Sequence, residues 1–196
     1  MRLGDPPATI ERSRLPVKKT PSELIRISEA KYPNPIYWSK LGWNRFDSPM
    51  APLGVFYTGE DFETALIEVF GDRWLGTKIL NEADLQPYLV HTIKLNNPWK
   101  AINLTGKGLS KVGVDANLCV SYDYPVTQKW AIAFMEHPQK PQGIIYHSRH
   151  NPRKLNYALF VDTTRDAEIK IVRQIPLLKH PRLFTILDAY RVSMIP

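Results

Sequence analysis

The sequence predicts a single α+β domain with mixed sheets and short helices. The chain has 196 residues, a length that fits one domain of about 100–200 residues. Segments with strand and helix patterns follow one another without a regular βαβ alternation, which favours the α+β class. Seventeen prolines exceed the usual share of about 5% and favour many loops and short elements.

The composition is that of a globular protein, with 43% hydrophobic and 23% charged residues. No apolar run approaches the roughly 18 residues that span a membrane, and the N-terminal segment lacks the apolar stretch of a secretory signal. Cys119 is the only cysteine, so no internal disulfide is possible and a reducing cytoplasm is the expected location. The net charge of +7 favours anionic partners: nucleic acid, phosphorylated metabolites or an acidic protein.

Residues 1–21 are rich in proline, lysine and arginine and show little apolar periodicity. They are expected to form a mobile basic arm, with the domain itself spanning residues 22–196. No internal repeat or linker divides the remaining chain into two cores.

The first half of the domain begins with a predicted strand at 24–28 (LIRIS), where apolar and polar residues alternate. A long, aromatic, proline-broken loop follows at 31–52, and GVFYT at 54–58 is a short buried strand. Asp61 offers a capping group for a helix over about 61–71, whose apolar residues form one stripe at helical spacing.

The second half alternates strands with less regular segments. The pattern predicts strands at 88–95, 143–148, 157–162 and 168–175, a loop-rich segment at 102–118, and a helix at 126–137. The tail at 183–195 is interpreted either as a closing helix or as a partner-binding one.

Three polar residues interrupt segments that otherwise resemble core: Arg26 in LIRIS, Glu68 in FETALIEVFG and Ser148 in GIIYHSRH. Removing a polar side chain from water costs about 1–3 kcal/mol unless it gains a partner, and a charge costs more. Three such interruptions suggest one shared polar cleft. Glu68 lies beside the apolar stripe of its helix, where it could also face solvent. Arg26 has a fork of donors suited to phosphate, although an ion pair or an exposed edge strand would also explain it.

Other residues near these segments could contribute to binding. Arg45 lies in a loop among aromatic residues, which could instead stack on its guanidinium. Tyr57 ends a buried strand, where it could be core or could stack on a planar ligand. Ser148 could cap the backbone or, beside Arg149, bind phosphate or ribose. No metal site is expected, because the histidines show no metal-ligand spacing.

The chain resembles the RES family, named for its Arg, Glu and Ser. The resemblance covers about residues 24–162 and rests on sequence words in a fixed order: a strand with Arg26, Arg45-Phe46-Asp47 before GVFYT, Ala65-Leu66-x-Glu68, Gln128-x-Trp130, GIIYHSR and ALFVD. The chain departs from the family at Asn44-Arg45-Phe46-Asp47, where RES proteins often show Gly-Arg-aromatic-Asn. Asp47 is expected to change the hydrogen bonding around Arg45.

The resemblance implies a fold similar to that of ADP-ribosyltransferase toxins. RES proteins usually act as the toxin of a bacterial toxin–antitoxin pair whose partner is an Xre-type helix-turn-helix protein. They deplete NAD+ by hydrolysis or phosphorolysis of the nicotinamide–ribose bond. The chain is therefore expected to be an NAD+ glycohydrolase or NAD+ phosphorylase, with inorganic phosphate as co-substrate in the second case and no cofactor.

By the same resemblance, Arg26, Tyr57, Glu68 and Ser148 are the residues expected at the site. Glu68 and Arg26 are the expected catalytic residues. The expected NAD+-binding residues are Arg26, Arg45, Tyr57, Ser148 and Arg149, with Arg45 or Arg149 assisting Arg26 at the pyrophosphate. Nucleic acid would be contacted only through the antitoxin, and no membrane is involved. Other classes stay open at this point: an ADP-ribosyltransferase that modifies a protein, a basic nucleic-acid-binding module, and an inactive interaction protein.

Overall fold

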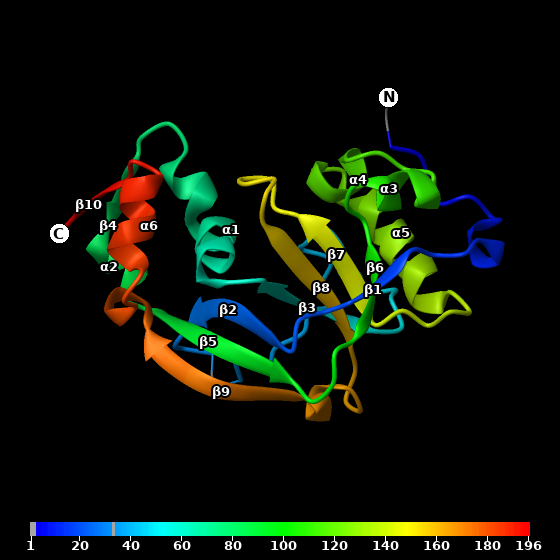
Figure 1. Ribbon diagram of the computed structural model, residues 1–196, viewed down its shortest axis with the longest axis horizontal. Helices are drawn as coiled ribbons and strands as arrows, with labels where there is room; N and C mark the ends of the chain where they lie inside the picture. The colour runs from blue at the N-terminus through cyan, green and yellow to red at the C-terminus, as the bar shows by residue number, and fades with distance from the viewer. Residues whose placement is uncertain (1–2, 33) are drawn as a thin grey trace.

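An eight-stranded sheet runs through the residues that the computed structural model describes, 3–32 and 34–196 (Figure 1). All neighbouring strands are antiparallel except β6 and β7, which are parallel. In spatial order the strands are β1 (Val17–Lys19), β6 (Lys100–Asn103), β7 (Gly143–His147), β8 (Leu155–Val161), β3 (Gly54–Gly59), β2 (Glu23–Glu29), β5 (Tyr88–Leu95) and β9 (Ile169–Pro176).

Short helices surround this sheet, which confirms the predicted α+β class. The α-helices are α1 (Phe62–Trp74), α2 (Glu82–Leu85), α3 (Lys107–Val112), α4 (Asn117–Val120), α5 (Tyr124–Glu136) and α6 (Leu183–Ala189). Three 3₁₀ turns in the described part of the chain are η1 (Ile10–Arg12), η2 (Asp166–Glu168) and η3 (Leu177–Lys179). Within that same part, no helix is long and apolar enough to cross a membrane.

The sheet divides between β2 and β3. These strands share a single pair, Ile25 with Gly59, whereas β2 pairs along its whole length with β5 and β3 pairs along its whole length with β8. The ladder between β2 and β3 therefore stops after one position. Figure 1 shows β2, β5 and β9 running in a different direction from β7 and β8, on the other side of β3. This division leaves backbone groups and side chains accessible in the middle of the sheet.

The core consists of three buried clusters: one on each half of the sheet and a third that joins the two halves. Helix α5 packs Phe134 on one half beside Ile144, with α3 and α4 nearby. Helices α1 and α6 cover the other half, where Phe70 and Leu187 belong to one buried cluster. A third cluster, around Phe56, joins side chains of β2 and β5 to those of β3, β7 and β8. Apolar burial thus fixes both halves independently and also connects them.

Helix α1 begins where the sequence predicts, because Asp61 Oδ1 accepts a hydrogen bond from the Thr64 amide at 2.8 Å. The predicted apolar stripe is buried, and Val69 at its edge is half-buried. Gly59 lets the helix approach the sheet: a Cβ there would lie 2.8 Å from the Ala65 amide nitrogen. The residue three positions after Ala65 is Glu68, so this close approach also sets the height of Glu68 above the sheet.

Residues 3–21 correct the expectation of a mobile basic arm. Strand β1 pairs with β6, and the side chains of Ile10 and Leu15 belong to the buried cluster under α5. The Leu15 amide also donates to Gln139 Oε1 at 2.6 Å. Sequence periodicity misses this segment because its few apolar contacts are spaced irregularly. Residues 1 and 2 lie outside the described residues.

In the second half of the chain one expectation is wrong, and one of two predicted alternatives is found. The segment at 102–118, expected to be loop-rich, contains α3 and the start of α4. The tail closes the fold: Leu183, Ile186 and Leu187 of α6 are buried, and strand β10 (Ser193–Ile195) pairs in parallel with β4 (Ile79–Asn81). The remaining predicted strands and the helix at 126–137 are present with small shifts of their ends.

Candidate functional site

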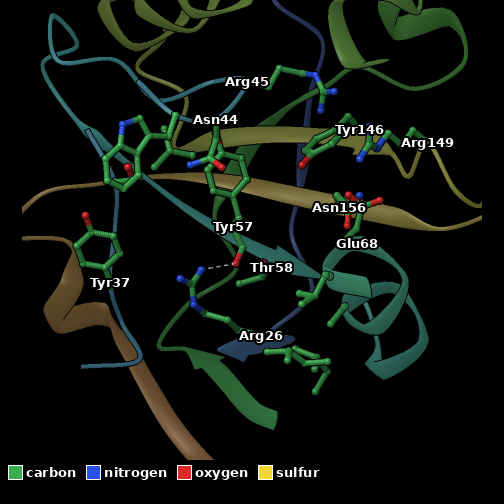
Figure 2. A pocket seen from close by; sticks show the side chains of 18 of the residues that line it. Arg26, Tyr37, Asn44, Arg45, Tyr57, Thr58, Glu68, Tyr146, Arg149 and Asn156 are labelled. Carbon is green, nitrogen blue, oxygen red and sulfur yellow. Dashed lines mark hydrogen bonds between the residues drawn. The ribbon is translucent and has the colours of Figure 1, made fainter. Parts of the chain in front are cut away.

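A cleft of about 410 Å³ lies where β2 and β3 separate, between this part of the sheet and helix α1 (Figure 2). Its wall combines charged and amide side chains with several aromatic rings. The polar and aromatic lining residues are Arg26, Tyr37, Ser39, Trp43, Asn44, Arg45, Tyr57, Thr58, Tyr124, Tyr146, Glu68, Arg149 and Asn156. Five of the six site residues predicted from the sequence are therefore brought together, and the sixth, Ser148, lies directly behind one of them.

Arg26 bridges the division of the sheet. Its Nη1 donates to the Tyr57 carbonyl oxygen at 2.8 Å, and its guanidinium lies 4.8 Å from the centre of the Phe56 ring. The Nε atom is buried and has no hydrogen-bond partner among the described residues. No carboxylate in that part of the chain lies within 4.0 Å of the guanidinium. Burial lowers the pKa of Arg26 to about 10, and the group keeps its positive charge at neutral pH.

Glu68 is held by Ser148. The Ser148 hydroxyl donates to Glu68 Oε1 at 2.5 Å and accepts from the amides of His150 and Asn151 at 3.2 and 3.3 Å. Ser148 is 1% exposed and does not line the cleft. The structure therefore places its hydroxyl behind Glu68, as a capping and orienting group, and corrects the expectation that it faces the ligand. Glu68 itself is half-buried and forms no ion pair within the described residues.

Tyr57 joins the cleft wall to the aromatic loop that precedes β3. Its hydroxyl accepts from the Phe46 amide at 3.0 Å and donates to Asp47 Oδ1 at 3.5 Å, so the ring has a fixed orientation beside the cleft. Burial raises the pKa of Tyr57 well above its ordinary value. The hydroxyl is therefore a structural group, and the ring face is the part available to a ligand.

Asp47 organises the loop that carries Arg45. It is fully buried and accepts hydrogen bonds from the Ser39 hydroxyl at 2.5 Å, the Asn44 amide at 2.8 Å and the Gly42 amide at 3.2 Å. The expected change of hydrogen bonding at this position is thus a network centred on a carboxylate. A buried carboxylate with several donors is satisfied without a cation.

The other two predicted arginines are already partly engaged. Arg45 Nε donates to the Ser121 carbonyl oxygen at 3.3 Å, and its guanidinium lies 5.8 Å from the centre of the Tyr124 ring. Arg149 forms an ion pair with Asp72 and a hydrogen bond with the Tyr122 hydroxyl. Both line the cleft, so each can turn a remaining donor towards an anion.

Several lining residues escape the sequence analysis. Tyr146 lies beneath the cleft, where burial and the nearby Glu68 carboxylate raise its pKa. Trp43 is 76% exposed at the cleft mouth, and Tyr37 is half exposed there. The sequence shows Trp43 in an aromatic loop and Tyr146 three residues before Arg149, but only the fold places both residues in one cleft. Asn156 carries no local pattern at all.

Unsatisfied polar atoms concentrate in this cleft. Among the described residues, six buried side-chain nitrogen or oxygen atoms lack a hydrogen-bond partner, and three of them belong to lining residues: Arg26 Nε, Thr58 Oγ1 and Asn156 Nδ2. Buried polar groups in proteins are nearly always paired, so such a concentration indicates a place where a ligand completes the hydrogen bonds. The cleft thus offers cationic and neutral donors, one carboxylate and aromatic faces to a polar ligand with planar rings.

Comparison with known proteins identifies the family of the chain. The family model described as the RES domain matches residues 23–181, which include every predicted site residue. The protein named "Probable toxin y4kH" from Sinorhizobium fredii is 30% identical over 78 residues, which are 40% of this chain and 61% of that protein. The chain therefore matches less than two thirds of this curated relative.

The fold also has a counterpart among solved structures. A chain in the crystal structure of the M. tuberculosis MbcT–MbcA toxin–antitoxin complex superposes with a TM-score of 0.63 and 17% sequence identity. The match covers 92% of this chain and 94% of that one. At this identity the likeness concerns the fold, and it agrees with the toxin fold expected from the sequence.

Proposed function

The chain belongs to the RES domain family, and on this basis we propose that it is the toxin of a toxin–antitoxin pair that depletes NAD+ by cleaving the nicotinamide–ribose bond. The observation that carries the proposal is the placement of Arg26 and Glu68 on one cleft, with no ion pair neutralising either group among the described residues. NAD+ has an anionic pyrophosphate, which needs a cation such as Arg26. Its ribose develops positive charge during cleavage, which needs a carboxylate such as Glu68.

The carboxylate suits the chemistry of this bond. Cleavage gives the ribose oxocarbenium character, as in glycoside hydrolysis. Nicotinamide leaves as a neutral molecule from a cationic ring, so the reaction needs no general acid. Glu68 would accept a hydrogen bond from a ribose hydroxyl and place negative charge near the developing cation. Ser148, which donates to Glu68 at 2.5 Å, would hold the carboxylate in this orientation.

The remaining lining groups would bind the rest of NAD+. Arg26, with Arg45 or Arg149, would hold the pyrophosphate through charge-assisted hydrogen bonds. Because Arg149 already pairs with Asp72, we assign the larger share of this binding to Arg26. The fixed ring of Tyr57 and the exposed ring of Trp43 would stack on the planar bases.

The acceptor of the ribose is either water or inorganic phosphate. The cationic side chains that would hold the pyrophosphate would also attract free phosphate, and phosphorolysis is compatible with the same carboxylate. The proposal thus covers both an NAD+ glycohydrolase and an NAD+ phosphorylase.

A protein with this activity must be silenced by a partner. We extend the proposal to an Xre-type helix-turn-helix antitoxin that covers the cleft. Two features suit such a partner: the exposed aromatic side chains of Trp43, which lines the cleft, and Tyr122, which contacts Arg149; and the net charge of +7 of the whole chain, which favours an acidic contact surface. Direct nucleic-acid contacts would then belong to the antitoxin.

The test is a time course of the purified protein, freed of any co-purified partner, with NAD+ in the presence and absence of phosphate. Chromatography resolves nicotinamide from the ribose product. Nicotinamide release supports the proposal, and a phosphate requirement selects phosphorolysis. If folded protein releases no nicotinamide under either condition, the proposal is wrong. ADP-ribose attached to an added protein would then favour the transferase class, and salt-sensitive DNA or RNA binding without NAD+ loss the nucleic-acid class.

A further inference from the structure

Asn156 is a buried donor that the fold leaves unused. It lies on β8 and is 3% exposed, and its Nδ2 atom has no hydrogen-bond partner among the residues that the structure describes. Its side chain nevertheless lines the cleft. A buried amide that faces a cleft without an acceptor in the protein is suited to an acceptor on a ligand.

The register of the sheet places this amide close to helix α1. Asn156 lies opposite Gly59 on β3 and opposite Tyr146 on β7, so the three positions share one face of the sheet. Gly59 has no side chain to cover the amide. The same glycine lets α1 approach to within contact of the sheet at Ala65, one turn before Glu68.

Glu68 is the carboxylate among the described residues that line the cleft, and Arg149 lies at the same end. The Glu68 carboxylate is close enough to Tyr146, the cross-strand neighbour of Asn156, to raise its pKa, after the larger effect of burial. Figure 2 shows Asn156, Glu68 and Tyr146 at the same end of the cleft, away from Tyr37 and Arg26. A carboxylate acceptor and an amide donor thus lie at the same end of the cleft.

This pairing selects one kind of ligand group. A hydroxyl can donate its hydrogen to a carboxylate and accept from an amide N–H at the same oxygen. A phosphate oxygen could accept from the amide but would be repelled by the carboxylate. Of the polar groups of NAD+, the ribose hydroxyls are the ones that can do both at a single oxygen atom, whereas the carboxamide and adenine would need two separate atoms.

We propose that Asn156 Nδ2 donates a hydrogen bond to the oxygen of a nicotinamide-ribose hydroxyl whose hydrogen is donated to Glu68. Asn156 is then a specificity-determining residue that makes cleavage depend on a hydroxylated ribose. This inference rests on the proposed cleavage of NAD+.

The experiment is a double-mutant cycle between protein and substrate. The kcat/KM for nicotinamide release is measured for wild type and Asn156→Ala with NAD+ and with its 2′-deoxy and 3′-deoxy nicotinamide-ribose analogues. We expect Asn156→Ala to lower kcat/KM for NAD+ about 10- to 100-fold, because an active-site hydrogen bond is lost. For the analogue that lacks the contacted hydroxyl, the same substitution should lower kcat/KM less than about threefold, since the bond is already absent.

A matched control is Asn103→Ala. Asn103 lies on β6 outside the cleft, and its Oδ1 accepts from Thr105, so the substitution removes an amide of the same size and also costs some stability. It should leave the ratio of kcat/KM between NAD+ and both analogues unchanged. Thermal unfolding of each variant identifies any loss of folded protein.

The outcomes separate the two proposals. If wild type cleaves NAD+ and Asn156→Ala loses the same factor with NAD+ and with both analogues, the assignment of Asn156 is wrong and the proposed function stands. If folded wild-type protein neither cleaves nor binds NAD+, the proposed function is wrong and the assignment is overturned with it. A loss that appears with NAD+ and with one deoxy analogue, but not with the other, supports the assignment and identifies the missing hydroxyl of that other analogue as the one that Asn156 contacts.

Discussion

The Arg26 guanidinium donates to the Tyr57 carbonyl oxygen at 2.8 Å, across the gap where the ladder between β2 and β3 ends after the Ile25–Gly59 pair. A side chain thus replaces a backbone hydrogen bond at the point where the sheet opens. Because Nη1 is used in this way and Nε remains unpaired, the same residue both holds the cleft open and presents a cation to it. This relationship links the unusual position of an arginine among aliphatic residues to the site.

Replacing Arg26 should weaken NAD+ binding more than it lowers stability. Arg26→Lys keeps a positive charge but lacks the planar fork that can contact Tyr57 and a phosphate together. We expect KM for NAD+ to rise about 10-fold or more, since a hydrogen bond to a charged group contributes about 1.5–3 kcal/mol. Steady-state kinetics measures the effect. Arg12→Lys, at an exposed position on η1, serves as the matched control and should leave KM unchanged. An unaltered KM in Arg26→Lys would contradict the role given to Arg26.

Removing the Ser148 hydroxyl should affect turnover rather than binding. Ser148→Ala leaves the cleft wall intact but frees the Glu68 carboxylate from its 2.5 Å hydrogen bond. We expect kcat to fall about 10-fold or more while KM for NAD+ changes little, because the interaction lost is one that orients charge in the transition state. Ser110→Ala, at an exposed position on α3, is the control. A rise in KM at constant kcat would indicate instead that Ser148 binds substrate directly.

Asp47 should be important for stability. It is fully buried and accepts from the Ser39 hydroxyl and from two loop amides, so Asp47→Ala leaves several buried donors without a partner. Each buried unsatisfied group costs about 1–3 kcal/mol, and 1 kcal/mol shifts Tm by about 2–4 °C in a protein of this size. We expect Tm to fall by about 4 °C or more in Asp47→Ala, and by less in Asp47→Asn, which keeps one acceptor. Calorimetry that finds equal Tm values would contradict this account of the loop.

His91 should make stability depend on pH. It is 1% exposed, its Nε2 lies 2.9 Å from the Ser28 hydroxyl, and burial followed by repulsion from Arg26 lowers its pKa. A histidine whose folded pKa lies below the unfolded value of 6.5 contributes stability that is complete above pH 6.5 and is lost as pH falls below it. Urea unfolding of wild type should therefore show a free energy that falls between pH 6.5 and pH 5.

His91→Gln isolates this contribution. The pKa values of His150 and His180 are also lowered, by burial first, so the variant should reduce the pH slope without abolishing it. A slope that is unchanged in His91→Gln would show that His91 titrates alike in the folded and unfolded states.

The sequence predicts most elements whose pattern is local. Strand β5 and helix α1 are found at or near their predicted bounds because alternation and a capped apolar stripe are encoded within a few residues. Strand β1 is missed because its three residues are all exposed and its pairing partner lies more than 80 positions away, so nothing local marks it. Local patterns identify elements, and long-range pairing is determined by the packed fold.

The same distinction applies to the site. Arg26 and Glu68 are found because each is a charge in an apolar segment, an anomaly visible without a structure. Asn156 and Tyr146 are not found, because an amide or a tyrosine in a strand is unremarkable until the register pairs Asn156 with both Gly59 and Tyr146. Ser148 is found, but its position behind Glu68 depends on how the turn after β7 folds against α1.

The central claim is tested most directly by nicotinamide release from NAD+ in wild type and Glu68→Gln, measured together with NAD+ binding. The substitution keeps the size of the side chain and an acceptor for Ser148 but removes the negative charge. We expect release to fall about 100-fold or more while binding persists, because the charge acts on the developing ribose cation. Release at the wild-type rate from Glu68→Gln would contradict the account.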